Sequence, residues 1–182
     1  MSPFSESLFA TIAGSGYQMT TRMQILTGII TVSDRAARGE YDDLGGPALR
    51  KAAESGGWRV LAEAVVPDET REIQRAIREH IRKGCQLVLT TGGTGVALRD
   101  VTPEAVRAIA VRELPGFGEA MRRESMRITP NAILSRNLAA VVGKSLVICL
   151  PGKPGGAVEC LGFVADAIPH CIEVLQEVPT SC

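Results

Sequence analysis

The stretch QLVLTTGGTG, residues 86–95, decides the fold of this 182-residue chain. Gln86–Thr91 is a short run of apolar and β-branched residues, which predicts a buried strand because it is too short for an independent helix. The glycines that follow allow the backbone to turn sharply where the strand ends. Ligands of α/β sheets bind at the carboxyl ends of strands, so this turn is the first candidate for a binding loop.

Strands and helices alternate on both sides of this stretch. Further strands are predicted from short apolar runs at Ile25–Val32, Trp58–Val66 and Ser145–Leu150. Helices are predicted, from apolar periodicity and from Pro or Gly at their ends, over residues 47–55, between 69 and 84, over 104–114, around 119–127, near 132–136 and from about 157. This alternation predicts an α/β fold with a mostly parallel sheet covered by helices on both faces.

The N-terminus and the cysteines narrow the class of protein. Residues 1–22 are rich in Ser and Gly and lack periodicity, which predicts a loose N-terminal extension before a single domain over residues 23–182. No apolar run is long enough to span a bilayer, and no basic segment typical of a signal peptide is present. An odd number of cysteines without a C-x-x-C pair predicts reduced thiols in a cytoplasmic protein: Cys85, Cys149, Cys160, Cys171 and Cys182.

Charge and aromatic content argue against a nucleic-acid partner. Twenty basic and twenty acidic residues cancel to a formal charge of zero, and only 4% of the residues are aromatic. An anionic ligand must therefore be held by local loops. Two familiar nucleotide-binding motifs are incomplete in this sequence. Leu138 stands where a P-loop has its first Gly, and Leu98 stands where a dinucleotide-binding fingerprint has its third Gly. His80 and His170 form no zinc-binding helix motif, and we expect structural roles for both.

Four loops at predicted strand ends carry polar or flexible residues. They are Ser33-Asp34-Arg35, Pro67-Asp68-Glu69, Gly92–Asp100 and Pro151–Gly156. Consecutive glycines allow backbone N–H groups to converge on an anion, and a helix N-terminus shortly afterwards adds further donors. In the same loop, Thr94 offers a hydroxyl, and Asp100 offers a carboxylate for a hydrated Mg²⁺ beside phosphates.

Each of these features also has a simpler structural explanation. A Gly-rich turn after a strand is more often only a turn, and Asp100 also fits a loop or capping residue. Asp68 stands just before a helix, where Asp is favoured as an N-cap, and Thr102-Pro103 fits an N-cap with a first-turn proline. Lys153 fits a phosphate contact or a solvated side chain. The residues alone leave these alternatives open.

Six blocks of sequence, taken together and in order, favour a functional explanation. They read ITVSDRAARGEYDDLGGPAL, VPDE, LVLTTGGTGVALRDVTPEA, PGFGEAMR, AILSR and LPGKPGGAVECL. They span the chain from about Ile25 to Leu161, nearly all of it outside the N-terminal extension. This combination resembles the MoaB/Mog family of molybdopterin-binding domains.

The resemblance implies a three-layer α/β/α domain that forms a homotrimer. The family's reaction transfers AMP from ATP to the terminal phosphate of molybdopterin and releases pyrophosphate, in the biosynthesis of the molybdenum cofactor; a molybdenum insertase is an expected later partner. Two aspartates of the family match Asp68 and Asp100, which are expected to bind a divalent cation such as Mg²⁺ and to align the α-phosphate. Other residues that match the family's ligand-binding loops are Gly92, Gly93, Thr94, Gly95, Ser33, Asp34, Ser135, Pro151 and Gly152.

Three alternatives to this reaction stay open. They are a paralogue that binds molybdopterin without adenylylating it, a nucleotide pyrophosphatase of the competence-damage type, and a scaffold domain. Both aspartates and the PGFGEAMR block favour the enzyme, and the SDRAARGEYDD block argues against the pyrophosphatase. The chain departs from many relatives at Leu98, where they have Pro, and at Lys153, which precedes rather than follows the second Pro of its loop. The second departure weakens a phosphate role for Lys153.

Overall fold

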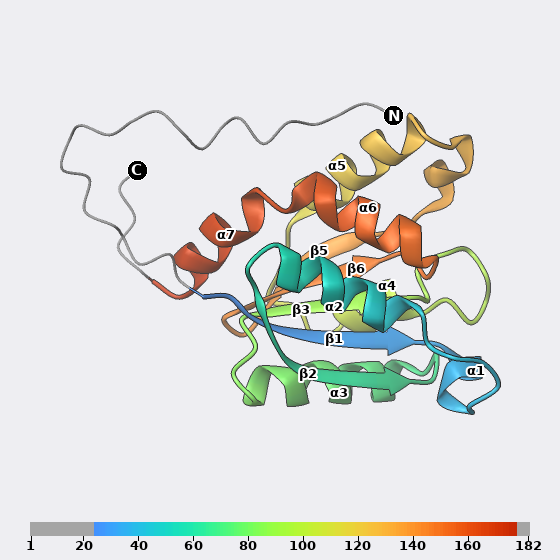
Figure 1. Ribbon diagram of the computed structural model, residues 1–182, viewed down its shortest axis with the longest axis horizontal. Coiled ribbons are helices and arrows are strands. Elements are labelled where there is room, and N and C mark those ends of the chain that lie inside the picture. The colour runs from blue at the N-terminus through green and yellow to red at the C-terminus, as the bar shows by residue number, and fades with distance from the viewer. Residues whose placement is uncertain (1–23, 178–182) are drawn as a thin grey trace.

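A six-stranded sheet forms the middle of the molecule (Figure 1). The computed structural model describes residues 24–177. The strands are β1 (Leu26–Val32), β2 (Arg59–Val66), β3 (Leu87–Thr91), β4 (Arg112–Glu113), β5 (Leu138–Val142) and β6 (Ser145–Leu150). They lie in the order β2-β1-β3-β6-β5-β4. Strands β2, β1, β3 and β6 are parallel, and β5 runs antiparallel to β6 and β4, so the predicted mostly parallel sheet is confirmed.

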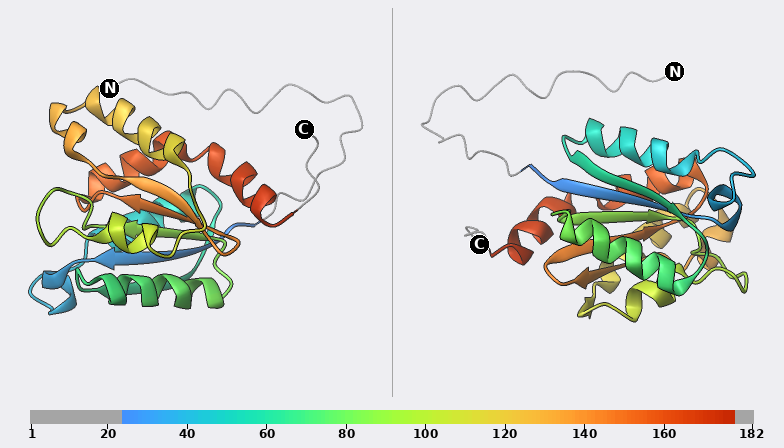
Figure 2. Two further views of the ribbon diagram at one scale, coloured as in Figure 1. Left: turned by 180° about the vertical axis from the view of Figure 1, so that it is seen from behind. Right: turned by 90° about the horizontal axis from the view of Figure 1, so that it is seen from below.

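Helices cover both faces of the sheet and make three layers (Figure 2). One apolar cluster joins the sheet to α2 (Gly45–Ser55), α5 (Pro115–Met126), α6 (Pro154–Val164) and α7 (Ala167–Leu175). A second cluster joins the opposite face to α3 (Thr70–Arg82) and α4 (Thr102–Arg107). The short helix α1 (Asp34–Ala37) and the 3₁₀ helix η1 (Pro130–Leu134) complete the described elements.

Side chains alternate between the two faces of a strand, so the short strand β1 contributes to both apolar clusters. Ile29 and Ile30 of β1 are fully buried, and because successive side chains point to opposite faces, each enters a different cluster. Strand β2 lies at the edge of the sheet and alternates between buried and more exposed residues. The central strands β3 and β6 are buried throughout, as expected for strands covered on both sides.

The region between β3 and β6 differs most from the prediction. The helix predicted over 104–114 ends at Arg107, and residues 112–113 form β4 against β5. Strand β5 was not predicted, because its five small apolar residues, LAAVV, fit a helix as well as a strand. Gly143, with φ of 62°, forms with Lys144 the two-residue hairpin turn that pairs β5 with β6.

Several helix boundaries also differ from the prediction. The helix expected near 132–136 is the 3₁₀ helix η1. Helices α2, α5 and α6 begin earlier than expected, at Gly45, Pro115 and Pro154. Pro115 and Pro154 start their helices because proline has no N–H to lose in a first turn and its φ already suits a helix.

His80 and three cysteines are buried, as expected of structural residues, whereas His170 is exposed. The His80 ring is buried, with Nε2 3.2 Å from the carbonyl oxygen of Ile29. Burial lowers the pKa of His80, and burial raises the pKa of the Cys149 thiol to about 12. Cys85, Cys149 and Cys160 are buried free thiols, and Cys171 is partly buried.

Some predictions concern parts of the chain without a structural description. The N-terminal extension, residues 1–22, and Cys182 lie outside the described residues. Within residues 24–177, no helix has both the length and the apolar character that a membrane span requires.

Candidate active site

The four parallel strands end next to one another at one edge of the sheet. Their register pairs Val32 of β1 with Val66 of β2, and pairs Thr91 of β3 with both Thr31 of β1 and Leu150 of β6. The loops after these strands therefore begin side by side. The four loops identified from the sequence come together here, at the carboxyl edge where α/β sheets bind ligands.

The first two glycines of the glycine turn, Gly92–Gly95, are packed too closely for a Cβ atom. A Cβ on Gly92 would lie 2.1 Å from the carbonyl oxygen of Val32, and one on Gly152 would lie 3.3 Å from Cα of Gly92. A Cβ on Gly93 would lie 2.3 Å from Oγ1 of Thr102. Gly92 and Gly93 also have φ of 104° and 63°, a conformation that other residues rarely adopt. These two glycines are thus required by the fold itself.

Unpaired donors in this turn face the candidate site. In the part of the chain that the structure describes, the backbone N–H groups of Gly93, Thr94 and Gly95 donate no hydrogen bond to another protein group. Thr94 is nevertheless 4% exposed. Gly93 and Gly95 are partly exposed. Because buried N–H groups are normally paired, the unpaired N–H of Thr94 between two other free donors is suited to an anionic ligand.

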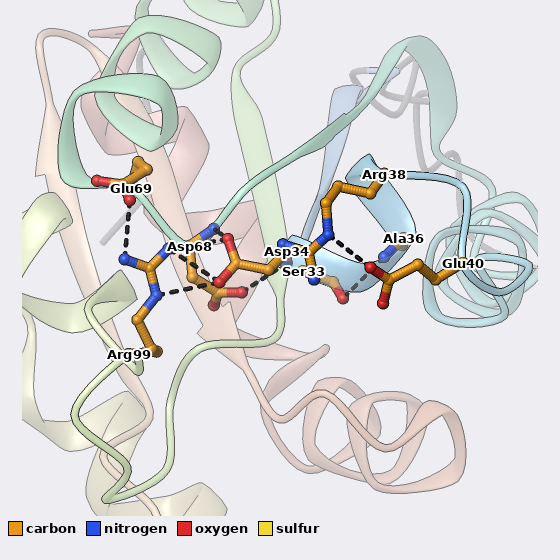
Figure 3. A network of polar contacts seen from close by, with 8 residues as sticks. All are labelled: Ser33, Asp34, Ala36, Arg38, Glu40, Asp68, Glu69 and Arg99. Atoms are coloured by element: carbon orange, nitrogen blue, oxygen red, sulfur yellow. Dashed lines mark hydrogen bonds and ion pairs between the residues drawn. The ribbon is translucent and has the colours of Figure 1, made fainter.

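Asp68 is held by a reciprocal pair of hydrogen bonds with Asp34 (Figure 3). The backbone N–H of Asp34 donates to Oδ2 of Asp68 at 2.8 Å, and the backbone N–H of Asp68 donates to Oδ1 of Asp34 at 3.0 Å. The other oxygen, Oδ1 of Asp68, lies 3.1 Å from where a Cβ on Gly93 would stand. One carboxylate oxygen is thereby fixed by the backbone, and the other faces the glycine turn.

The two carboxylates have opposite pKa shifts. Burial, together with the nearby carboxylates of Asp34 and Asp100, raises the pKa of Asp68, although the hydrogen bond from Asp34 opposes this. Burial also acts against ionisation of Asp34, but the Arg99 guanidinium and the Asp68 backbone N–H outweigh it, so the pKa of Asp34 lies below its ordinary value. Of these two carboxylates, Asp68 is therefore the one whose ionised form is disfavoured in the folded protein.

The structure also tests the capping explanations of Asp68 and Thr102. The N-cap of α3 is Glu69, which makes no side-chain cap, and Asp68 bonds to Asp34 instead, so the capping explanation of Asp68 is wrong. The N-cap of α4 is Val101. The Thr102 hydroxyl donates to the carbonyl oxygen of Gly92 at 2.9 Å, and so fixes the glycine turn rather than the helix end.

Asp100 is placed by its own loop. Its Oδ2 accepts the backbone N–H of Ala97 at 2.8 Å, and a Cβ on Gly95 would stand 2.8 Å from the same oxygen. From the other side, Nε of Arg136 donates to the carbonyl oxygen of Gly95 at 2.7 Å, and Nη2 of Arg136 donates to that of Asp100. Arg136 thus braces both ends of the segment that carries Asp100.

Two hollows meet at these residues. The larger, of about 650 Å³, lies beside α5, η1 and the start of α6, and the smaller, of about 390 Å³, lies beside the loop that leads into α2. Gly93, Asp100 and Gly152 line both hollows. The larger contains the predicted residues Thr94, Gly95, Ser135 and Pro151, and the smaller contains Ser33, Asp68 and Gly92. Asp34 lines neither hollow and lies behind Asp68, which it supports.

Asp43 is a functional candidate that the sequence analysis missed. Its Oδ2 accepts the Thr31 hydroxyl at 2.7 Å, and its Oδ1 accepts the backbone N–H groups of Gly45 and Gly46 at 2.9 and 3.1 Å. Asp43 thereby pairs the first two N–H groups of α2, whose N-cap residue is Leu44, and it lines the smaller hollow. An acidic residue shortly before a helix was the signal that would have identified it. Arg136 and Arg99 had no such signal, because their partners are distant in sequence.

The carboxylates suit a cation that is shared with phosphates. Among residues 24–177, no group of three His, Cys, Asp or Glu side chains is arranged to hold a metal ion by itself. Mg²⁺ is commonly bound by one or two carboxylates, with substrate phosphates and water supplying the other ligands. Asp68 and Asp100 fit that second arrangement, because both line the smaller hollow together with Gly93, whose backbone N–H is unpaired.

Residues 28–170 match the family model described as the probable molybdopterin binding domain. The chain belongs to this family. Within the molybdopterin-binding family, the molybdopterin adenylyltransferase of Helicobacter pylori strain J99 is 44% identical over 151 residues, which cover 81% of this chain and 86% of that protein. The molybdopterin adenylyltransferase of Escherichia coli K12 is 42% identical over 164 residues, or 82% and 84% of the two chains.

A solved structure of the same family agrees with the fold. The molybdopterin biosynthesis enzyme MoaB from Thermus thermophilus superposes with a TM-score of 0.80 and 43% sequence identity. The match covers 87% of this chain and 100% of that one. The family resemblance and the three-layer fold expected from the six sequence blocks are confirmed.

Proposed function

We propose that this protein is a molybdopterin adenylyltransferase, which transfers AMP from ATP to the terminal phosphate of molybdopterin and releases pyrophosphate. Relatives of that name are 41–44% identical to this chain over most of its length. The reaction requires two phosphate-bearing substrates to meet. It also requires charge neutralisation more than it requires a covalent nucleophile.

The observation that carries this proposal is the meeting of two hollows at the carboxylates. Gly93, Asp100 and Gly152 belong to both, so a ligand in each hollow would bring its phosphate to the same place. A protein that only binds molybdopterin needs one such hollow. A transferase needs two, with acidic groups and unpaired N–H donors where they join.

In the proposed reaction, an oxygen of the molybdopterin phosphate attacks the α-phosphorus of ATP, and the bond to pyrophosphate breaks. The N–H groups of Gly93, Thr94 and Gly95 orient the phosphates and stabilise the negative charge that develops. Asp34 holds Asp68 in place, and Arg136 holds the loop of Asp100. Asp68 and Asp100, together with the phosphates, would hold a divalent cation such as Mg²⁺, and its positive charge would offset repulsion between the two substrates.

The test is direct adenylylation. Purified protein is incubated with molybdopterin, ATP and Mg²⁺, and we expect a product heavier by one adenylyl group, formed together with pyrophosphate. EDTA and the Asp100→Asn variant are the controls. Tight binding of molybdopterin without product would favour the non-adenylylating paralogue. Release of AMP and pyrophosphate from ATP without adenylylated product would favour the pyrophosphatase.

Assembly and cellular context belong to the same proposal. We expect a cytoplasmic homotrimer with closed threefold symmetry, as the resemblance implies, whose product passes to a molybdenum insertase. Light scattering should give three times the mass of one chain. A monomer at micromolar concentration would contradict the proposed assembly.

A further inference from the structure

Arg99 connects three loops of the active site (Figure 3). Its Nε donates to Oδ2 of Asp34 at 3.0 Å, and its Nη2 donates to Oδ1 and Oδ2 of Asp34 at 2.9 and 2.8 Å. Its Nη1 donates to Oε1 of Glu69 at 2.8 Å. The loop after β3 is thereby tied to the loops after β1 and β2.

These contacts link the two proposed cation ligands. Arg99 directly precedes Asp100 in the chain, and its guanidinium contacts both oxygens of Asp34. Asp34 in turn exchanges hydrogen bonds with Asp68 through both backbones. The path from Asp100 through Arg99 and Asp34 to Asp68 consists of covalent and charge-assisted bonds only, so a change at Arg99 reaches both aspartates.

Arg99 also carries positive charge into the group of carboxylates around Asp68 and Asp100. Asp34, Asp68, Glu69 and Asp100 bring four carboxylates into this region, and Arg99 is the cation whose guanidinium contacts two of them. The Arg99 guanidinium contacts both carboxylate oxygens of Asp34 at 2.8–3.0 Å. Oxygen ligands of this kind attract divalent cations, so an uncovered Asp34 would compete with Asp68 and Asp100.

We propose that Arg99 is a positioning residue of the AMP transfer, which covers Asp34 and so leaves the divalent cation to Asp68 and Asp100. The effect on catalysis rests on the proposed function. The covering of the Asp34 carboxylate by Arg99 does not depend on it. The fork of a guanidinium matches both oxygens of one carboxylate, which a single ammonium group cannot do.

The first measurement is the affinity of the full, nucleotide-free chain for Mn²⁺. Binding is monitored through the electron paramagnetic resonance signal of free Mn²⁺. Arg99→Met removes the covering charge, and we expect it to bind Mn²⁺ at least threefold more tightly than the parent protein. The matched control is Arg38→Met. Arg38 follows helix α1, and its backbone N–H donates to the carbonyl oxygen of Asp34 at 3.1 Å. Its guanidinium affects the Asp34 carboxylate only through its charge, while its Nε donates to Glu40 at 2.6 Å. We expect Arg38→Met to change the affinity by less than 1.5-fold.

The second measurement is rescue. Asp34→Asn in the Arg99→Met background removes the competing carboxylate but keeps an oxygen that can accept the Asp68 N–H. We expect Mn²⁺ affinity to return to within twofold of the parent value. In the transfer assay, Arg99→Met should lower kcat at least tenfold, while KM for ATP changes less than threefold. The double variant should have a kcat at least five times that of Arg99→Met.

The fold should tolerate these changes, because the Arg99 side chain is 56% exposed. If Arg99→Met loses its fold, Arg99→Gln provides the same measurement with a neutral donor. Unchanged Mn²⁺ affinity in the Arg99 variant overturns the inference, and so does a double variant that binds as tightly as the single one. Mn²⁺ binding needs neither substrate, so absence of AMP transfer in the parent protein would refute the proposed function and still allow this inference to be decided.

Discussion

Replacing Asp68 by Asn removes one charge and changes little else. Oδ2 of Asp68 accepts the Asp34 N–H at 2.8 Å, and the oxygen of Asn can accept the same hydrogen bond. The other oxygen, beside Gly93, becomes an amide nitrogen that cannot bind a cation. The N-cap residue of helix α3 is Glu69 and not Asp68, so a loss of about 0.5–2 kcal/mol from a missing N-cap is not expected.

The expected effects on stability and on turnover therefore differ greatly. Folding raises the pKa of Asp68, which means that the ionised form is disfavoured in the folded state, and a neutral Asn relieves that cost. We expect stability to stay within about 1 kcal/mol of the parent, or about 4 °C in Tm, with any change being a gain. Loss of a cation ligand should raise the barrier by about 3–4 kcal/mol, which lowers kcat by about 10²–10³.

Two assays separate these effects. Adenylylated product is followed by mass at saturating ATP and molybdopterin, and Tm is measured on the same preparations. Asp68→Ala is the companion variant, and it should also lose about 0.5–1.5 kcal/mol because the Asp34 N–H has no acceptor. Turnover by Asp68→Asn within threefold of the parent would refute a role for Asp68 in cation binding.

Two glycines and the pH dependence give further predictions. Gly93→Ala should lower the free energy of unfolding in urea by more than about 1–2 kcal/mol, because φ is 63° and the new Cβ would stand 2.3 Å from Oγ1 of Thr102. Gly95→Ala should instead lower kcat by about tenfold or more and leave Tm nearly unchanged. The new Cβ would stand 2.8 Å from Oδ2 of Asp100 and would push this oxygen away. Normal turnover would show that the position of Asp100 does not matter. The transfer rate should fall as the pH falls through the raised pKa of Asp68, since protonation removes a cation ligand, and a pH–rate profile at higher Mg²⁺ should show this loss shifted to lower pH.

Sequence by itself determined the α/β class, the central strands and the loops that carry the site. These features depend on local patterns, such as the apolar run from Leu87 to Thr91 and the glycines that follow it. The six sequence blocks determined the family. Strand β5 escaped detection because five small apolar residues have no period of their own, and only pairing with β6 defines them as a strand.

Only the tertiary structure decided what the polar residues contact. Sequence placed Asp68 before a helix and predicted a cap as readily as a ligand, whereas the fold brings it against Asp34, which lies 34 residues earlier, and gives α3 another N-cap. Arg99 reaches Asp34 across 65 positions, and Arg136 reaches Gly95 across 41. The bonds of Asp68 and Arg99 form because parallel strands end in register at one edge of the sheet, and Arg136 reaches the same edge from the segment between η1 and β5. Their partners are neighbours in space, and a local pattern cannot contain them.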